Sequence, residues 1–486
     1  MPSRTRTLAR RIAQVAAVAA AVIVASTGAS ADSVIAWRGT TEIAAGGGER
    51  GAWQQNASRY DFVDDPAVAL DAHGNAALVW VDQRRKDVLF RWIDAGDATR
   101  RTPVVNVSRT PDVFSWLPRI VLSPASKRRV FVLWQEIVFS GGSHGGDILF
   151  VRSTDGGRTF DAPLNLSRSV GGDGKGRITR DVWHNGSHDL ALAANGALHA
   201  AWTEYDGALW VSRSTDDGRT FTAPLQVGGD RERPARAPAL APGPGATLYL
   251  AWTVGEDPAA DVRVARSMDG GRTFAPPVLV SASAAYSDAP KLAVDRHGTV
   301  HVAYAESSGG PFERYRIRYA RSRDGARTFA AGRDISGADG EGAAFPSLAV
   351  DLHDRVCIVW ERYPDVRSRP RGLGFACSAD GGDMFGAPAP IPGTASAQRA
   401  NGGLEGLLMN KVAINGSGAV AVVNSQFEAG AGSSVVLVRG RLTTKRRGKP
   451  RRRSRHPCVV SARGCGGTGS RSPAGSRRRG TTPRVR

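Results

Sequence analysis

Short apolar runs separated by polar turns recur along most of the chain, and no stretch of residues 32–440 keeps a helical periodicity. Each repeat opens with an apolar segment and a turn, and a second run follows that usually ends in an aromatic residue. The runs are rich in Val, Leu, Trp and Tyr and are bounded by Gly, Asp and Pro, which is typical of β-strands. The aromatic position is filled by Trp80, Trp134, Trp202, Trp252, Tyr304 and Trp360, with Asn424 in its place in the seventh repeat.

A third run and a short fourth run complete each repeat, and five repeats carry one phrase between them. The phrase is Ser-x-Asp-x-Gly-x-Thr-Phe, with Ala326 replacing Gly in the fourth copy and Met384 replacing Thr in the fifth. Self-similarity at a spacing of 53 to 61 residues indicates a repeat architecture. The aspartates of the phrase are Asp155, Asp216, Asp269, Asp324 and Asp380.

Four antiparallel strands per repeat, arranged in series, predict an all-β protein with the fold of a β-propeller. The repeats favour seven blades, with six as the alternative. Residues near 52–58 resemble the fourth strands of the first two repeats, around Val105–Arg109 and Leu164–Arg168. We therefore predict that an N-terminal strand near residues 52–58 completes the last blade and closes the ring.

The net charge of +20 belongs to the two ends of the chain. Residues 1–31 hold four Arg and residues 441–486 hold 16 Lys and Arg, which leaves 45 basic against 45 acidic residues between them. A neutral middle excludes a domain that is steered as a whole toward a polyanion. The sequence predicts a propeller over residues 32–442 and a basic, disordered tail over residues 443–486, where an anionic polymer is a candidate partner.

The first 31 residues have the pattern of a secretory signal, with a basic start, the apolar run of residues 12–25 and the cleavage site Ala29-Ser30-Ala31. An uncleaved anchor is the alternative, although about 14 apolar residues barely span a bilayer. We expect a secreted, periplasmic or cell-envelope protein with no membrane span after cleavage. Four cysteines suit an oxidising compartment, and Cys357 and Cys377 are expected to form a disulfide across one hairpin, while Cys458 and Cys465 lie in the tail.

The repeated phrase resembles the Asp-box, or bacterial neuraminidase repeat, of the sialidase superfamily, and the resemblance covers roughly residues 52–440. It implies a propeller in which the aspartates are structural and their turns lie on the face away from any active site. It does not by itself imply sialidase activity, because similar boxes occur in other glycosidases and in non-enzymatic propellers. The chain also lacks the Arg-Ile-Pro segment and a clear trio of arginines that sialidases use to grip a carboxylate.

The opposite face should carry the variable loops, where binding residues are usually found. Carboxylates follow the second strand of five repeats, and they either pair with neighbouring arginines and cap loops or serve in acid–base chemistry; they are Asp82, Glu136, Glu204, Glu306 and Glu361. Sialidase-type hydrolysis needs a proton donor and a tyrosine nucleophile. The catalytic candidates are Glu136, Glu204, Tyr205 and Asp181.

The longest loop between repeats, residues 168–187, is predicted to form a pocket with these carboxylates. The ligand-binding candidates are Arg119, Arg180, Trp183, His184, His188 and Arg236. A metal bound by His184 and His188 is the weaker interpretation, because a loop has no helix to align two imidazole rings four residues apart. Neither a metal nor a cofactor is therefore expected. The sequence favours a monomeric propeller that binds glycans or proteins without classical sialidase catalysis; the alternative is a sialidase-like glycoside hydrolase.

Overall fold

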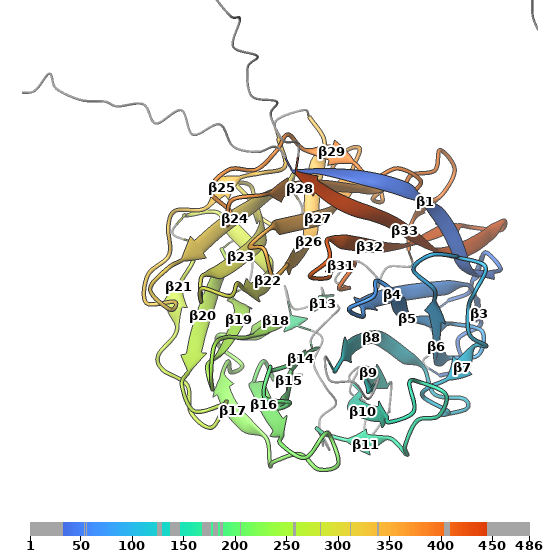
Figure 1. Cartoon of the computed structure of the whole chain (residues 1–486), viewed down its shortest axis with the longest axis horizontal. Helices are drawn as coiled ribbons and strands as arrows, with labels where there is room; N and C mark the ends of the chain where they lie inside the picture. Colours follow the sequence, from blue (N-terminus) through green and yellow to red (C-terminus); the bar gives the residue numbers. More distant parts are fainter. Residues whose placement is uncertain are drawn as a thin grey trace, which may run out of the picture. The chain divides into compact units, whose positions relative to one another are not determined.

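The computed structural model describes residues 33–444 except 53, 55, 124–128, 137–145, 168–175, 178–182, 185–187, 205, 256–258, 282, 312, 338–339 and 403–408. The described residues contain strands and no helix, and seven sheets follow one another round a ring (Figure 1). This arrangement confirms the prediction of a seven-bladed β-propeller, and the six-bladed alternative is wrong. The predicted signal segment and nearly all of the basic tail, including Cys458 and Cys465, lie outside the described residues.

Six blades are four-stranded sheets in which each strand pairs with the next along the chain. Blade 1 consists of β4 (Val63–Leu70), β5 (Ala76–Asp82), β6 (Asp87–Ile93) and β7 (Val105–Asn106). Blade 2 consists of β8 (Ser115–Leu122), β9 (Val130–Glu136), β10 (Asp147–Ser153) and β11 (Leu164–Asn165). Blade 3 consists of β14 (His188–Leu192), β15 (Leu198–Thr203), β16 (Leu209–Ser214) and β17 (Leu225–Gly228).

The next three blades repeat this order. Blade 4 consists of β18 (Ala235–Pro242), β19 (Leu248–Val254), β20 (Asp261–Ser267) and β21 (Val278–Leu279). Blade 5 consists of β22 (Tyr286–Val294), β23 (Val300–Ser307), β24 (Arg316–Ser322) and β25 (Arg333–Asp334). Blade 6 consists of β26 (Gly342–Val350), β27 (Val356–Tyr363), β28 (Leu373–Ser378) and β29 (Ala389–Pro390).

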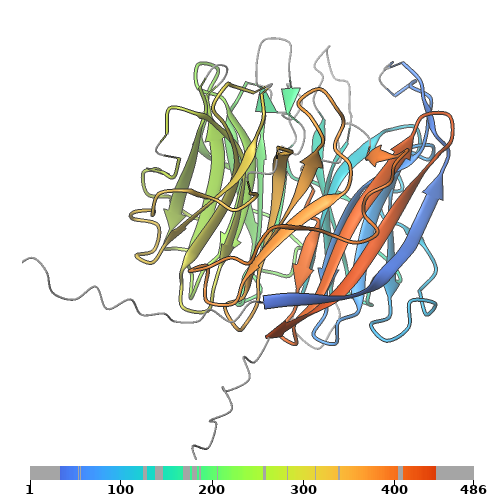
Figure 2. The same cartoon turned by 90° about the horizontal axis from the view of Figure 1, so that it is seen from above.

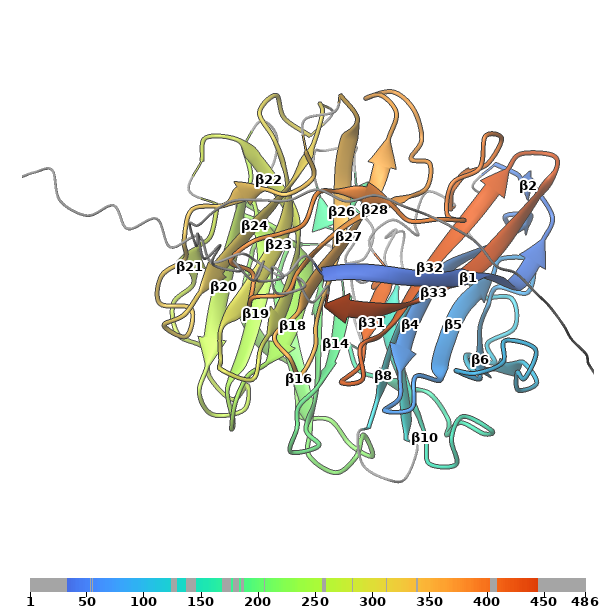
Figure 3. The ribbon, with the colours of Figure 1, turned by 45° about the horizontal axis from the view of Figure 1, so that its top comes forward.

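Blade 7 joins the two ends of the propeller. Its strands β30 (Ala400–Asn401) and β31 (Val412–Ile414) both pair with β32 (Ala419–Glu428), which pairs with β33 (Gly432–Thr444). The outermost strand is β1 (Ser33–Gly46), which runs antiparallel beside β33 from Ser33 opposite Thr444 to Gly46 opposite Ser433 (Figure 3). The ring is thus closed by an N-terminal strand, as predicted.

The predicted position of that closing strand, residues 52–58, is wrong. The longer segment β1 offers 14 residues to β33, whereas the described part of residues 52–58 forms only a bridge between Gln54 and Asn56. Asn56 instead fixes the neighbouring loops, because its Oδ1 accepts a hydrogen bond from the Phe114 amide (3.0 Å) and its carbonyl accepts one from Lys86 Nζ (2.7 Å). The short hairpin of β2 (Glu49–Arg50) and β3 (Tyr60–Asp61) brackets this segment.

The hydrophobic core lies between the blades. Seven clusters of buried side chains fill the seven blade interfaces in turn. The aromatic residue that ends each second strand belongs to the cluster shared with the preceding blade, as Trp134 packs with Phe90 of blade 1 and Trp202 packs with Phe150 of blade 2. Burial of such large side chains contributes roughly 1.5–3 kcal/mol each, so the interfaces account for much of the stability.

The repeated phrase forms one turn five times over. In blade 2 the Asp155 carboxylate accepts hydrogen bonds from the amides of Arg158 (2.9 Å) and Thr159 (3.0 Å) and from the Thr159 hydroxyl (2.7 Å). Ser153 Oγ donates to Asp155 and accepts from the Gly157 amide at 2.7 Å. Equivalent bonds hold the turns at Asp216, Asp269 and Asp324, and the Asp380 turn keeps those of Ser378 and of the Met384 amide. We call these five segments the Ser-Asp turns.

Each Ser-Asp turn also fastens its blade to the one before it. The turn phenylalanine packs on an aromatic ring of the preceding blade, as Phe160 does on Phe90 (centroids 5.5 Å apart) and Phe221 does on Phe150 (4.8 Å). The second glycine sits at positive φ with that ring beside it, so a side chain at Gly157 would come within 2.2 Å of Phe90. The phrase therefore serves the blade interface as well as its own turn.

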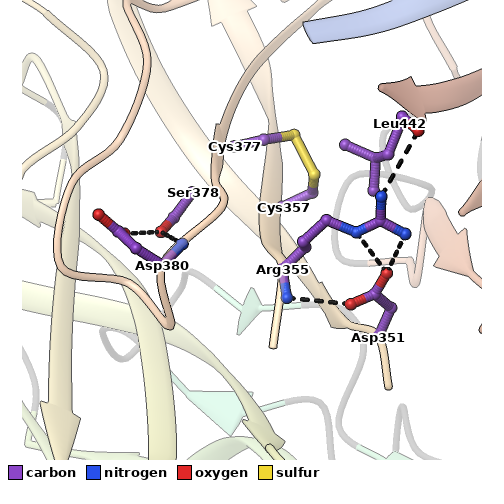
Figure 4. Close-up of a disulfide and its surroundings, with 7 residues drawn as sticks. All are labelled: Asp351, Arg355, Cys357, Cys377, Ser378, Asp380 and Leu442. Atoms are coloured by element: carbon purple, nitrogen blue, oxygen red, sulfur yellow. Dashed lines mark hydrogen bonds and ion pairs between the residues drawn. A yellow bond between two sulfur atoms is a disulfide. The ribbon is translucent and has the colours of Figure 1, made fainter. Parts of the chain in front are cut away.

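The expected disulfide is present in blade 6. Cys357 of β27 lies opposite Cys377 of β28, and their sulfur atoms are bonded (Figure 4). Beside it, Arg355 donates through Nε to Asp351 at 2.6 Å and through Nη1 to the Leu442 carbonyl of β33 at 3.5 Å. The disulfide thus lies next to the contact between blade 6 and the closing blade.

The Ser-Asp turns all lie on one face. They follow the ends of the third strands, where the turns between first and second strands also lie. The loops between second and third strands and the connections between blades reach the opposite face, which we call the variable-loop face. The hairpin of β12 (Gly176–Arg177) and β13 (Trp183–His184) is inserted there between blades 2 and 3 (Figure 2).

Candidate functional site: a polar cluster on the propeller axis

The innermost strands bring one residue per blade to the same level of the central channel. Each residue lies opposite the second-strand residue that precedes the aromatic position, as Arg119 does opposite Leu133 and Lys291 does opposite Ala303. In five blades a proline comes directly before this position. The seven residues are Ala67, Arg119, Asp189, Ala239, Lys291, Ser347 and Lys411.

Side chains from four blades are joined by an ion pair and hydrogen bonds at this level. Arg119 Nε of blade 2 lies 3.6 Å from Asp189 Oδ1 of blade 3. Asn410 of blade 7 donates to Asp189 at 3.4 Å and accepts from Lys291 Nζ of blade 5 at 3.0 Å. Because blades 3, 5 and 7 are not neighbours in the ring, side chains that meet in this way must lie near its axis. We call Arg119, His188, Asp189, Lys291 and Asn410 the axial cluster.

The Leu117 carbonyl oxygen connects two members of the axial cluster. It accepts hydrogen bonds from Arg119 Nη1 at 3.2 Å and from His188 Nε2 at 2.8 Å. Leu117 has a φ of 56°, one of five residues with positive φ that precede the prolines of the first strands. Because a carbonyl only accepts, His188 carries its proton on Nε2, and its buried Nδ1 is an acceptor with no hydrogen-bond partner among the described residues.

Burial sets the charges of the axial cluster. Burial and the neighbouring Arg119 lower the pKa of Lys291 to about 7, against a smaller opposing effect of Asp189. Burial and the same guanidinium hold the pKa of His188 well below its usual value, so the ring is neutral at physiological pH. Lys291 is therefore a group that gains or loses a proton near neutrality, next to a permanent cation.

A second buried group lies between blades 4 and 5, nearer the variable-loop face. Arg236 Nε is 3.3 Å from Asp288 Oδ1, and Arg236 Nη2 donates to the Tyr286 hydroxyl at 2.6 Å. Burial and the nearby Asp288 raise the pKa of the adjacent Tyr315 far above its usual value. These contacts link the two blades.

The carboxylates that follow the second strands are engaged with their surroundings. Glu136 accepts hydrogen bonds from Thr110 Oγ1 at 2.7 Å and from Trp134 Nε1 at 3.1 Å, so its side chain points between blades 1 and 2. Glu306 pairs with Arg318 at 3.1 Å, and the buried Glu361 contacts Lys411 and Asn401. Asp82 caps the amides of Arg84 and Arg85 (both 3.1 Å).

Three of these carboxylates have a raised pKa. Burial raises the pKa of Glu136, and burial with the nearby Asp206 raises that of Glu204. Burial also raises the pKa of Glu361, against the opposing charge of Lys411. A raised carboxyl pKa is what a proton donor requires. The catalytic assignments of Glu136, Glu204, Tyr205 and Asp181 stay predictions, and Tyr205 and Asp181 lie outside the described residues.

Among the predicted ligand-binding residues, the structure brings Arg119 and His188 together and leaves Arg236 in the neighbouring group. Arg180 lies outside the described residues, and only the backbone of Trp183 and His184 is described. No cluster of three or more His, Cys, Asp or Glu side chains that suits a metal occurs in the described part of the chain. The same part contains no helix with the length and apolarity that a membrane span requires.

The sequence alone did not single out Lys291 and Asn410. A signal existed in the repeat, because the residue after the opening proline is Ala67, Arg119, Ala239, Lys291 or Ser347. A charged residue in that place breaks the otherwise small and neutral pattern. The repeat does not indicate that side chains of blades 5 and 7 extend across the channel toward those of blades 2 and 3.

The fold defines the chain as a seven-bladed β-propeller. No protein-family model matches the sequence, and no curated protein matches it. Similar solved structures include an ulvan lyase of polysaccharide lyase family PL25, with 11% identity, a TM-score of 0.52, and coverage of 82% of this chain and 95% of the lyase. The same lyase also appears bound to -[GlcA(1-4)Rha3S]-, with a TM-score of 0.51.

Two further propellers match less closely. An α-L-arabinanase of Penicillium chrysogenum has 16% identity and a TM-score of 0.43, covering 66% of this chain and 92% of its own. The Hadza microbial sialidase Hz136 has 13% identity and a TM-score of 0.42, covering 69% of this chain and 66% of its own. At these identities the likeness is one of fold.

Proposed function

We propose that the protein is an exported, carbohydrate-binding propeller that holds an anionic saccharide at the variable-loop face, over the axial cluster. The observation that carries this proposal is the meeting of Arg119 and Lys291, from blades 2 and 5, at the axis. Asp189 lies near both cations, and Asp65 lies near Arg119 as well. Donors from two blades converge at the axis, where the carboxylate or sulfate of a saccharide would contact both.

The hydrogen-bonding groups of the axial cluster suit a sugar as well as an anion. Arg119 and Lys291 are donors, Asn410 both donates and accepts, and the bare Nδ1 of His188 accepts a hydroxyl proton. Guanidinium groups prefer carboxylate, sulfate and phosphate. The ulvan lyase of similar fold binds a saccharide that contains a uronate and a sulfated rhamnose, which agrees with this choice of ligand class.

The Ser-Asp turns support assignment to the Asp-box propellers of the sialidase superfamily. Their aspartate side chains accept hydrogen bonds within the turns themselves, which agrees with a structural role on the face away from the ligand. The signal segment supports export, and we propose that the protein acts as a monomer whose basic tail contacts an anionic polymer at the cell surface.

A glycoside hydrolase is the second candidate, favoured by the raised pKa values of Glu136 and Glu204. In it one of these carboxyls would protonate the leaving oxygen, with Tyr205 or Asp181 as the second group. The absence of an Arg trio in the sequence argues against an exo-sialidase.

A glycan array that contains neutral, sialylated, uronate-bearing and sulfated saccharides tests the proposed function. The expected result is binding confined to anionic glycans, weakened at least about tenfold by Lys291→Met and unchanged by Lys86→Met, which removes a lysine of the blade 1 loops. Binding to no anionic glycan, or equal binding by both variants, overturns the proposal. Turnover of any fluorogenic glycoside that is lost in Glu136→Gln or Glu204→Gln would establish the hydrolase instead.

A further inference from the structure

A cavity of about 500 Å³ opens on the face of the Ser-Asp turns, opposite the variable-loop face. It lies between blade 1 and blade 2 and is lined by Asn75, Trp92, Ile93, residues 94 and 100–102 of the turn after β6, and Asp155, Gly156 and Arg158 of the first Ser-Asp turn. Its volume falls within the range of sites that hold small ligands. We call it the turn-face pocket.

The pocket exists because blade 1 lacks the repeated phrase. Its third and fourth strands are joined by a different turn, in which Asp94 Oδ1 accepts the amides of Gly96 (2.8 Å) and Asp97 (3.0 Å). Asp97 in turn accepts the amide and the hydroxyl of Thr99, at 2.9 and 2.7 Å. This self-bonded turn holds Arg100 and Arg101 at the rim, facing the Ser-Asp turn of blade 2.

The wall between the two blades is fixed as well. Trp92 Nε1 donates to the Gly156 carbonyl at 2.8 Å, and Trp92 is only 9% exposed. The Trp92 amide and carbonyl both bond to Thr102, through its hydroxyl (2.9 Å) and its amide (3.1 Å). These bonds fix Trp92 in the wall of the pocket.

The lining carries more positive than negative charge. Arg100, Arg101 and Arg158 oppose Asp94 and Asp155, and Asp155 is already saturated by its own turn. Arg100 makes a loose pair with Asp97 (3.7 Å), whereas neither Arg101 nor Arg158 has a carboxylate partner among the residues that the structure describes. Their guanidinium groups instead donate to carbonyl oxygens, Arg101 to Glu42 of β1 and Arg158 to Asp155 (both 3.5 Å), which leaves their charge uncompensated.

Further arginines crowd the same corner of the propeller. Burial lowers the pKa of Arg91, and the nearby Arg101 lowers it further. Burial also lowers the pKa of Arg439, with the nearby Arg38 as the next cause, and Arg439 donates to the Asp94 carbonyl at 2.6 Å. Crowded like charges of this kind are relieved by a bound anion.

A comparable cavity between blades 5 and 6 provides an internal contrast. It has a volume of about 440 Å³ and lies at the same level, beside the Asp380 turn. Its cations are neutralised, because Arg296 and His297 contact Asp354 (3.0 and 3.1 Å) and Arg323 contacts Asp383 (3.0 Å). Arg158 has counterparts in the other Ser-Asp turns, such as Arg272 and Arg327, which also donate to the carbonyl of their turn aspartate. What is particular to the turn-face pocket is Arg101, which the blade 1 turn adds to the same lining.

We propose that the turn-face pocket is a second binding site, for a saccharide unit that bears a carboxylate or a sulfate ester. Arg101 and Arg158 exchange their long contacts to carbonyls (both 3.5 Å) for bonds to the oxyanion through their guanidinium forks, and Asp94 accepts a bond from a sugar hydroxyl. The volume exceeds what an inorganic ion requires, which favours a sugar ring. The site does not depend on the axial cluster and would hold a different part of a chain, or a different chain, from the variable-loop face.

Isothermal titration calorimetry of the full chain at physiological salt tests this site with three probes: a tetragalacturonate, a sulfated tetrasaccharide and inorganic phosphate. We expect at least one of the saccharides to bind, and the variant Arg101→Ala/Arg158→Ala to bind it at least about tenfold more weakly. Both arginines are exposed, so the fold should be retained. The matched control is Arg272→Ala, which removes the same arginine of the phrase from the blade 4 turn.

Hydrogen exchange localises the effect. Saccharide binding should slow exchange of the amides of residues 94–102 and 155–159, and leave residues 268–274 unchanged. No binding of either saccharide, equal affinity of the wild type and the double variant, or an equal loss in Arg272→Ala would each overturn the proposal, and phosphate binding alone would contradict its saccharide part. Because the axial cluster is intact in all these variants, the outcome is independent of the function proposed for the variable-loop face.

Discussion

Arg119 of blade 2 and Asp189 of blade 3 form an ion pair in which the side chains are only 1% and 7% exposed. The Asp189 carboxylate also accepts the Leu240 amide of blade 4 at 2.8 Å. One pair of charges therefore joins three consecutive blades at the axis. A buried pair of this kind is sensitive to the loss of either partner, because the remaining buried charge loses its nearest opposite charge.

Removing Arg119 alone should therefore be costly. We expect Arg119→Met to lower the free energy of unfolding by about 3–5 kcal/mol, and Arg119→Met with Asp189→Leu to lower it by less than the sum of the single effects. Chemical denaturation gives both numbers. The control is the exposed Arg296, which pairs with the half-buried Asp354, since Arg296→Met should cost no more than about 1 kcal/mol.

Binding at the variable-loop face should strengthen in mild acid. Lys291, with a pKa of about 7, faces Arg119, Asp189, His188 and Asn410, and only its protonation changes near neutrality. Lowering the pH from 8 to 6 adds a positive charge and should raise the affinity for an anionic saccharide about five- to tenfold. The titration is repeated with Lys291→Met, which should abolish the pH dependence; persistence of the dependence would assign it to another group.

The two glycines of the Asp380 turn should differ in their tolerance of a side chain. Both have positive φ, but a Cβ at Gly382 would meet the Tyr319 hydroxyl at 1.8 Å, whereas one at Gly381 meets nothing within 4 Å. We expect Gly381→Ala to cost about 1 kcal/mol and Gly382→Ala at least about 2 kcal/mol more. Thermal unfolding of the two variants makes the comparison, and equal melting temperatures would refute the steric argument.

The disulfide should stabilise the closing side of the ring. It encloses a loop with a sequence separation of 20 residues, for which the chain-entropy estimate is about 3 kcal/mol. Unfolding of Cys357→Ala/Cys377→Ala, compared with the oxidised and the reduced wild type, measures this contribution. The double variant should match the reduced protein and melt below the oxidised one.

Stability should also fall between pH 6.5 and pH 4. Burial, with a smaller effect of Arg213, lowers the pKa of His199 to about 4. Near pH 6.5 the unfolded chain therefore binds a proton at His199 that the folded chain does not bind. The contribution of His199 to the free energy of unfolding is complete above pH 6.5. It is lost as the pH falls toward 4, by up to about 1.4 kcal/mol per pH unit. His199→Phe, which copies Phe131 at the same position of blade 2, should flatten this slope, while the exposed His73→Gln should not.

Much of the architecture was predictable because it is local and repeated. The Ser-Asp turns bond within themselves, the aromatic residue of the second strand in blades 1 to 6 packs against the preceding blade, and the register from Trp360 to Gly374 sets Cys357 opposite Cys377. The prediction placed the closing strand wrongly because it relied on a short resemblance of residues 52–58 to two fourth strands. That resemblance gives no information about strand length, whereas β1 is long enough to pair with the 13 residues of β33. No local sequence pattern indicates that two strands from opposite ends of the chain will pair.

The candidate site was predictable only in part, for a similar reason. Arg119 and His188 could be named from their positions after a proline and beside the long inter-blade loop. Their contact through the Leu117 carbonyl depends on a positive φ in the first strand, and the reach of Lys291 to Asn410 depends on the width of the closed ring. Contacts that depend on the closed ring cannot be predicted from the sequence of a single repeat.

The pairing of β1 with β33 has a kinetic consequence. Strand β1 precedes all seven blades in the described sequence, and its partner β33 follows the first six of them, so β1 stays unpaired while those six blades are synthesised. Native contacts of such long sequence separation form late and slowly. Assembly of the circle is therefore expected to be the final event of folding, and an incomplete chain would present an unpaired edge at each end.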